Sequence, residues 1–160
     1  MRFDSKEGLD KTDQSLLRLL RANARLSFAE LGRKLRMSPP AVAERMKRLE
    51  DWGVIRAYRA EIDLAALGRG LHVYFRVVIA PKDYPRFKKA VTAMEEILEC
   101  HHVTGEYDYL LKVVTRNTED LESFLLHKLT PTPGVARIHT GLVLREVKNI
   151  TAIPISKEHV

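Results

Sequence analysis

The stretch Ser38-Pro-Pro-Ala-Val-Ala-Glu-Arg-Met-Lys-Arg-Leu-Glu50 decides the organisation of the first third of the chain. Ser38 followed by Pro39 is typical of a helix N-cap with proline at the first helical position. The helix should end near Gly53, because glycine suits the position just after a helix C-terminus. Its apolar residues recur at helical spacing and predict a buried stripe, which consists of Val42, Met46 and Leu49.

Two shorter helices precede this one. Asp10 is a candidate N-cap for a helix over residues 11–22. Ser27 and Glu30 have the spacing of a capping box at the start of a second helix over residues 27–35. Only Arg36-Met37-Ser38 separates the second helix from the third. Three short helices with a tight link between the last two predict a helix-turn-helix, whose last helix enters the DNA major groove.

The outward side of the third helix suits contact with DNA. Pro40 and Ala41 are small enough for a close approach, and the longer or polar residues Ser38, Glu44, Arg45, Lys47 and Arg48 can reach base edges or phosphates. A solvated cationic helix face is the alternative, but the capping box and turn before it favour DNA. We expect phosphate contacts from Arg25, Ser27, Arg45, Lys47 and Arg56.

Charge distribution supports the same assignment. The 160 residues carry a formal net charge of +6, which permits an anionic partner without requiring one. From Lys11 to Trp52 there are ten basic and five acidic residues, so this quarter of the chain holds most of the excess. An N-terminal module that contacts phosphate, followed by a module with another task, is the simplest interpretation.

The chain then passes through a segment with β propensity. Residues 54–63 are β-prone, with Ile55, Tyr58 and Ile62 among charged side chains, and Gly68-Arg-Gly70 marks a joint. Arg56 and Arg59 either flank the DNA as wing residues or keep a connecting strand in solution. The sequence therefore divides into a helix-turn-helix domain (1–53), a linker strand and hinge (54–70), and a second domain with a C-terminal tail (71–160).

The second domain alternates strands and helices. The expected strands cover residues 71–80, 97–104, 107–115 and 135–144, and the expected helices follow Tyr84 and Asn117. This order is the ferredoxin-like βαββαβ arrangement, so the fold class is α+β. Both helices cover one face of such a sheet. The opposite face then needs a cover, and an identical subunit is the simplest one, which predicts a homodimer.

Several fragments together resemble the Lrp/AsnC family of transcription regulators. They are Leu9-Asp-Lys-Thr-Asp13, the stretch from Ser38 to Glu50, Trp52-Gly-Val-Ile55 and Thr104-Gly-Glu-Tyr-Asp-Tyr109. The resemblance covers residues 9–150. It implies a winged helix-turn-helix joined by a strand to a ferredoxin-like effector and oligomerisation domain. It also implies dimers that associate into an octamer of four dimers.

The resemblance further implies an effector site, commonly for an amino acid, between dimers near the turn Gly105-Glu106-Tyr107-Asp108. Asp108 can accept from an α-ammonium, and backbone N–H groups near Gly105 can hold an α-carboxylate. The family's other pocket-lining stretch corresponds to Thr140, Gly141 and Leu142. The alternative is that Gly105 only forms a hairpin turn and Asp108 only caps it.

Other functions find less support. His101 and His102 flank Cys100, yet adjacent strand residues point to opposite faces, so we predict no metal site and no cofactor. The sequence contains no phosphate-binding glycine loop, nucleophile elbow or paired metal-ligand motif, which leaves enzymatic activity unsupported. The stretch from Tyr107 to Val114 lacks the glycine-aromatic signature of RNA-binding sheets. A small-molecule-binding accessory subunit or enzyme without specific DNA binding remains the alternative.

Localisation is predicted from what the sequence lacks. Its apolar runs fall short of the ~18 residues that span a bilayer, and the first residues form no apolar signal core. The single cysteine suits a reducing compartment. We therefore expect a cytoplasmic protein without membrane contact.

Overall fold

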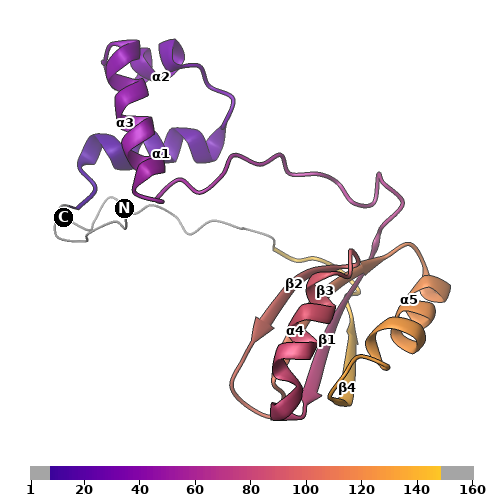
Figure 1. The fold of residues 1–160 in the computed structure, drawn as a ribbon. Helices are drawn as coiled ribbons and strands as arrows, with labels where there is room; N and C mark the ends of the chain where they lie inside the picture. The colour runs from indigo at the N-terminus through magenta and orange to yellow at the C-terminus, as the bar shows by residue number, and fades with distance from the viewer. Residues whose placement is uncertain (1–7, 149–160) are drawn as a thin grey trace. The chain divides into compact units, whose positions relative to one another are not determined.

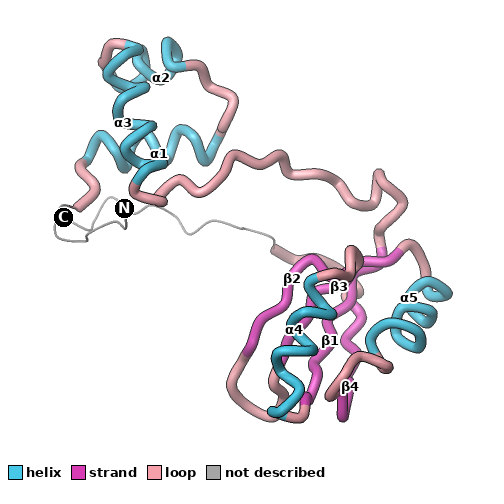
Figure 2. The backbone as a smooth tube through the Cα atoms, in the orientation of Figure 1, coloured by secondary structure: helices cyan, strands magenta, loops and turns pink. Residues whose placement is uncertain are grey.

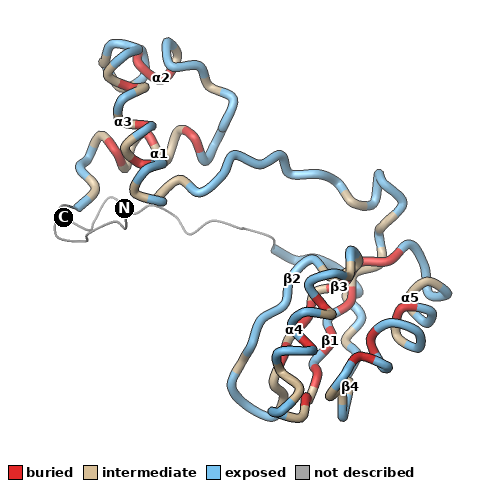
Figure 3. The backbone as a smooth tube through the Cα atoms, viewed as in Figure 1, coloured by how far each residue is buried: buried red, intermediate tan, exposed pale blue. Residues whose placement is uncertain are grey.

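The structure is a computed structural model that describes residues 8–148. The chain folds as two compact units, of which the first ends at Glu61 and the second covers Ile62–Lys148. Each unit buries an apolar cluster of its own (Figure 3). No helix in residues 8–148 is both long and apolar enough to cross a membrane. The predicted C-terminal tail, from residue 149 onward, lies outside the described residues.

The first unit contains α1 (Lys11–Ala22), α2 (Phe28–Leu35) and α3 (Pro39–Asp51) (Figure 1). All three predicted helices are confirmed, and α1 has the predicted bounds. Asp10 caps α1 and Ser27 caps α2, each through a reciprocal capping box. The unit's core consists of Leu16, Leu20, Leu31, Val42, Met46 and Leu49.

The turn between α2 and α3 packs closely against Gly32 of α2. Arg36 ends α2 in the left-handed conformation, with φ 56°, and the backbone N–H of Met37 donates to the Gly32 carbonyl at 2.9 Å. A Cβ atom on Gly32 would lie 2.5 Å from the Met37 carbonyl oxygen, which is closer than real Cβ atoms come. Glycine at position 32 therefore allows the turn to pack against α2.

Residues 54–70 differ from expectation. Turns and irregular backbone occupy this described segment, without the strand expected in residues 54–63 and without a paired wing. Arg56 to Asp63 are all exposed, and no neighbouring strand of the described chain offers them a hydrogen-bonding ladder. β propensity reflects fit to a half-buried sheet surface, so it does not produce a strand without a partner.

The second unit has the predicted βαββαβ order. It contains β1 (Leu71–Ile79), a 3-10 turn (Pro81–Asp83), α4 (Tyr84–Thr92), β2 (Ile97–His102), β3 (Tyr109–Thr115), α5 (Thr118–Phe124), the π-helical continuation η2 (Leu125–Leu129) and β4 (Val135–Leu142). The strands are antiparallel and lie in the order β2-β3-β1-β4 (Figure 2). The ferredoxin-like prediction is confirmed.

The two faces of the sheet differ in chemistry. Alternate residues of β1 from Val73 to Ile79 are buried with Phe87 of α4 and Phe124 of α5, which places both helices on that face (Figure 1). The intervening residues of β1 are His72, Tyr74, Arg76 and Val78, and Tyr74 is 38% exposed. Within one chain, the second face of the sheet thus stays accessible to solvent.

Candidate DNA-binding and effector-binding sites

The outward face of α3 carries predicted DNA contacts that remain exposed. Pro40, Glu44 and Lys47 recur at helical spacing opposite the buried stripe, and all three are exposed. Ser38 is the N-cap, and its hydroxyl accepts from the Ala41 backbone N–H at 3.4 Å. The start of α3 is therefore fixed by its cap and presents a small, accessible surface.

Arg45 lies on the flank of α3 that faces α1 and is bound there. Its Nη1 donates to Asp10 Oδ2 at 2.6 Å and to Asp13 Oδ1 at 2.8 Å. The hydrogen bonds to Asp10 first, and then to Asp13, raise the pKa of the Arg45 guanidinium. These contacts hold α3 against α1, a role that the sequence prediction did not give to Arg45.

Arg48 is held in the same way. Its Nη2 donates to both carboxylate oxygens of Asp13 at 3.0 Å, and its guanidinium lies 4.9 Å from the centre of the Trp52 ring. Asp13 is only 1% exposed, so its charge is compensated mainly by these two arginines. Sequence analysis gave Asp13 no partner, because the arginines lie more than thirty residues away in the chain.

The predicted phosphate contacts Arg25 and Arg56 meet in one groove. This groove has a volume of about 1110 Å³ and lies between the end of α1 and residues 54–60; it is also lined by Arg21 and Arg59. Ser27 points to another task, since its hydroxyl donates to Glu30 Oε2 at 2.7 Å and accepts from the Glu30 backbone. Four arginine side chains therefore line this groove, while the Ser27 hydroxyl is engaged in the capping box of α2.

The predicted effector turn connects β2 and β3. Gly105 has φ 122°, a left-handed value that favours glycine, and nothing lies within 4 Å of a Cβ built there. Asp108 closes the turn, because its carbonyl accepts from Val103 N at 2.9 Å and its N–H donates to the Val77 carbonyl at 3.0 Å. Glu106 is exposed, and Tyr107 lies beneath the Arg76 guanidinium at 5.7 Å.

The Asp108 side chain fixes this turn to the sheet and to α4. One carboxylate oxygen accepts from the backbone N–H of Ile79 at 2.8 Å, and the other accepts from the Tyr84 hydroxyl at 2.5 Å. The hydrogen bond from Tyr84, and then that from Ile79, hold the pKa of Asp108 below its ordinary value. A carboxylate has about four acceptor positions, so two remain for a ligand.

An aromatic cluster backs the turn. His102 stacks on Tyr109 with ring centres 4.8 Å apart, and Tyr84 meets both rings edge-on. The neighbouring His101 lies instead with Glu99, at 3.0 Å between Nε2 and Oε2. Among residues 8–148, no group of three or more potential metal ligands is found. Sequence analysis placed Tyr84 only at the start of an expected helix, and no motif in the sequence connects it to Asp108.

Thr140, Gly141 and Leu142 lie away from the effector turn within one chain. Thr140 pairs with Phe75 and Leu142 with Val73 on β1, whereas Asp108 binds Ile79 at the far end of that strand. At about 3.3 Å per residue, the separation is roughly 13–20 Å along β1. Leu142 is exposed on the edge strand β4. A site that contains both segments thus requires a second chain.

A helix-turn-helix unit with an exposed helix face, followed by a ferredoxin-like unit, defines a DNA-binding regulator with a separate ligand-binding domain. Family comparison agrees in both halves: residues 9–50 match the AsnC-type helix-turn-helix domain, and residues 72–153 match the Lrp/AsnC ligand binding domain. The chain belongs to the Lrp/AsnC family of transcription regulators.

Relatives extend over most of the chain. The leucine-responsive regulatory protein of Haemophilus influenzae is 37% identical over 145 residues, which are 89% of this chain and 87% of that protein. The HTH-type transcriptional regulator LrpC of Bacillus subtilis is 35% identical over 139 residues, 87% of this chain and 94% of the relative. These relatives are named as transcription regulators and not as enzymes.

Solved structures give the same result. A transcriptional regulator of Neisseria meningitidis in complex with L-methionine superposes with a TM-score of 0.88 at 35% identity, covering 92% of this chain and 97% of the other. Escherichia coli AsnC superposes with a TM-score of 0.86 at 26% identity, covering 91% and 99%. A feast or famine regulatory protein of M. tuberculosis complexed with L-methionine has a TM-score of 0.82 at 29% identity, covering 91% and 99%.

Proposed function

We propose that this transcription regulator binds a roughly palindromic DNA site as a homodimer and adjusts that binding to an amino acid. The DNA contact is inferred from the exposed row on α3 opposite the buried stripe, which consists of Pro40, Glu44 and Lys47. In this proposal residues 1–53 bind DNA and residues 54–70 link the two domains. Residues from 71 onward bind the effector and form the oligomer. Two-fold pairing of α3 helices places them about one DNA turn, or a multiple, apart.

The proposed DNA contacts fall into two groups. Ser38, Pro40, Ala41 and Glu44 contact bases, while phosphate contacts come from Arg25, Ser27, Lys47 and Arg56, with Arg45 and Arg48 at the flank. Arg25 and Arg56 suit phosphate because both are exposed and line one groove. Arg45 and Arg48 contribute through the guanidinium nitrogens that Asp10 and Asp13 leave available.

The proposed effector site is shared between chains. One chain supplies Gly105, Glu106, Tyr107 and Asp108, and a second supplies Thr140, Gly141 and Leu142. The separation of these segments along β1 supports the sharing. The two free acceptor positions of Asp108 suit an α-ammonium. Methionine is the first amino acid to test, because two structural relatives are complexes with it.

The proposed assembly rests on two observations: the distance along β1 between the two halves of the effector site, and the accessible second face of the sheet. The accessible face of the sheet pairs two chains, and effector sites between dimers require further association, for which four dimers in an octamer are the proposed arrangement. Effector binding then changes the assembly, and linkage requires that DNA and effector alter each other's affinity by the same factor.

The test is a footprint of the purified protein on its own upstream region and on random genomic fragments. It is run at two salt concentrations, without amino acids, with L-methionine, and with all twenty together. A protected palindrome that shifts with an amino acid is the expected result. Uniform, salt-sensitive binding without a site would contradict sequence-specific recognition. Complete absence of binding at low salt would favour an accessory subunit without specific DNA binding.

A further inference from the structure

Tyr84, the first residue of α4, connects the proposed effector turn to the rest of the second unit. Its hydroxyl donates to Asp108 Oδ1 at 2.5 Å, while the other carboxylate oxygen accepts from the Ile79 backbone N–H at 2.8 Å. Each oxygen of the Asp108 carboxylate therefore has one fixed donor. Because these donors belong to two different elements, α4 and β1, they remove rotational freedom that an aspartate side chain otherwise has.

The Tyr84 ring is itself held by packing. Its centre lies 5.3 Å from that of His102 and 5.6 Å from that of Tyr109, and both rings meet it edge-on. The chain just before α4 is fixed as well, because the Ala80 backbone N–H donates to the Gly134 carbonyl at 2.9 Å. The hydroxyl therefore approaches the carboxylate from a position that other contacts already determine.

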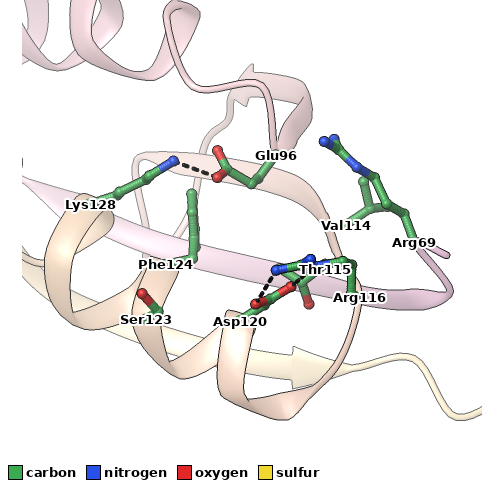
Figure 4. Close-up of a pocket in the computed structure, with 9 residues that line it drawn as sticks. All are labelled: Arg69, Glu96, Val114, Thr115, Arg116, Asp120, Ser123, Phe124 and Lys128. Atoms are coloured by element: carbon green, nitrogen blue, oxygen red, sulfur yellow. Dashed lines mark hydrogen bonds and ion pairs between the residues drawn. The ribbon is translucent and has the colours of Figure 1, made fainter. Parts of the chain in front are cut away.

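The Asp108 carboxylate is partly exposed and forms no ion pair within residues 8–148, where its side-chain donors are a neutral hydroxyl and a neutral amide. Two other carboxylates of this unit differ. At the opposite end of β3 they line a cavity of about 310 Å³, where each has a cationic partner (Figure 4). Lys128 donates to Glu96 there, and Arg116 donates to Asp120. An ammonium group is therefore the kind of partner that Asp108 lacks.

We propose that Tyr84 is a positioning residue of the effector site, whose hydroxyl orients the Asp108 carboxylate so that its free acceptor positions meet the ammonium of an amino acid. This inference rests on the proposed function, because it takes Asp108 as the group that binds the ammonium. A carboxylate that is already oriented loses less conformational entropy when the ligand binds, and affinity rises accordingly. Without the hydroxyl, Ile79 alone would hold the carboxylate, which could then rotate about that single contact.

Positioning of this kind has a chemical consequence that a purely structural contact does not have. It affects only a ligand whose cationic group binds Asp108. An amino acid should therefore bind more tightly because of Tyr84, whereas the same molecule with hydrogen in place of the ammonium should not. Tyr84→Phe removes the hydroxyl and keeps the ring that packs against His102 and Tyr109, so the two ligands distinguish positioning from folding.

The experiment is an amide-resonance titration of the full-length ¹⁵N-labelled protein with each of the twenty L-amino acids, starting with L-methionine. Affinity is measured from the amides of Gly105–Asp108, and the strongest binder is repeated as its deaminated analogue. Tyr84→Phe should weaken the amino acid by about fivefold or more and change the affinity of the analogue by less than about twofold. Tyr58→Phe is the matched control, because it removes a hydroxyl that donates to a carboxylate of the first unit, that of Glu50. It should change neither affinity.

A second measurement uses the wild-type protein and does not depend on the folding of a variant. Tyrosine is labelled with ¹³C at Cζ, the ring carbon that carries the hydroxyl. The Tyr84 Cζ signal should shift with the same saturation as the Asp108 amide, because an ammonium bound to the carboxylate weakens the hydrogen bond that the hydroxyl donates. A Tyr84 signal that does not respond while the Asp108 amide does would overturn the inference.

The titrations also separate this inference from the proposed effector site. Equal weakening of both ligands in Tyr84→Phe would show a structural role only and would overturn the inference. Unchanged or tighter binding of the amino acid would do the same, since tighter binding means that the hydroxyl competes with the ligand. In each case a wild-type response at Gly105–Asp108 leaves the proposed function intact. Absence of that response with all twenty amino acids would contradict the effector assignment of Asp108 and this inference together.

Discussion

The buried Asp13 carboxylate of α1 accepts a hydrogen bond from Arg45 Nη1 of α3 at 2.8 Å. Asp13 also completes the capping box of α1, so the same side chain fixes a helix start and a helix-helix contact. The position of α3 thus depends on Asp13, a buried residue that does not itself lie on the DNA-binding face.

Removing Asp13 should destabilise the first unit. Asp13→Ala leaves Arg45 and Arg48 without their shared carboxylate, and we expect a loss of about 2 kcal/mol in the free energy of unfolding. Urea unfolding followed by circular dichroism measures it. Asp51→Asn, at an exposed position late in α3, is the control and should change stability by about 0.5 kcal/mol or less. Similar losses in both variants would contradict the role given to Asp13.

Substituting Lys47 should affect DNA binding alone, whereas substituting Arg45 should also reduce stability. Lys47 is exposed, so Lys47→Ala should weaken binding to all duplexes similarly and reduce the slope of log affinity against log salt by about 1, without affecting folding. Arg45→Ala should also lower the melting temperature, because it breaks the contacts with Asp10 and Asp13. Fluorescence anisotropy at several salt concentrations and a thermal melt provide the comparison. Unchanged melting of Arg45→Ala would disprove the positioning role.

Asp108 should make stability depend on acid pH. Its pKa in the folded protein is lowered from 3.8, chiefly by the hydrogen bond from Tyr84, so its contribution is complete above the unfolded value and disappears as the pH falls through the lowered one. The difference in urea midpoint between wild type and Asp108→Asn should shrink from pH 6 to pH 3. A constant difference for Asp108→Asn would refute the prediction.

Tyr58 should ionise late in an alkaline titration. Tyr58 is 47% exposed, yet partial desolvation first, and then the hydrogen bond that its hydroxyl donates to Glu50 at 2.8 Å, raise its pKa to about 12. Its contribution to stability is present below its unfolded pKa near 10 and is lost as the pH rises toward 12. Difference absorbance between wild type and Tyr58→Phe isolates this titration. Glu50→Gln should move the midpoint only part of the way toward 10, because burial remains; an ionisation near 10 in wild type would exclude the contact.

Local signals in the sequence predicted most of the fold. Asp10, Ser27, Ser38 and Asn117 each cap the helix that they were expected to cap. These predictions succeed because a cap depends on residues three positions apart. The expected strand in residues 54–63 failed for the opposite reason, since a strand requires a partner that sequence proximity does not supply.

The candidate sites were less predictable. The exposed face of α3 follows from helical periodicity, so Pro40, Glu44 and Lys47 could be placed. The contacts between Asp13 and the arginines of α3, and between Asp108 and Tyr84, join positions that are 24 or more residues apart. Such pairs depend on how helices and strands pack, which no local pattern encodes.

The alternation along β1 limits how the gene for this protein can change in length. β1 pairs with β3 on one side and β4 on the other, and every second residue enters the core. Deleting the codon for Tyr74, for example, would reverse the facing of the residues that follow it relative to those before it, so Arg76 would turn toward the core and Phe75 would be exposed. Insertions and deletions should therefore be purged from this strand while they accumulate in residues 56–63, where the exposed chain has no register to lose.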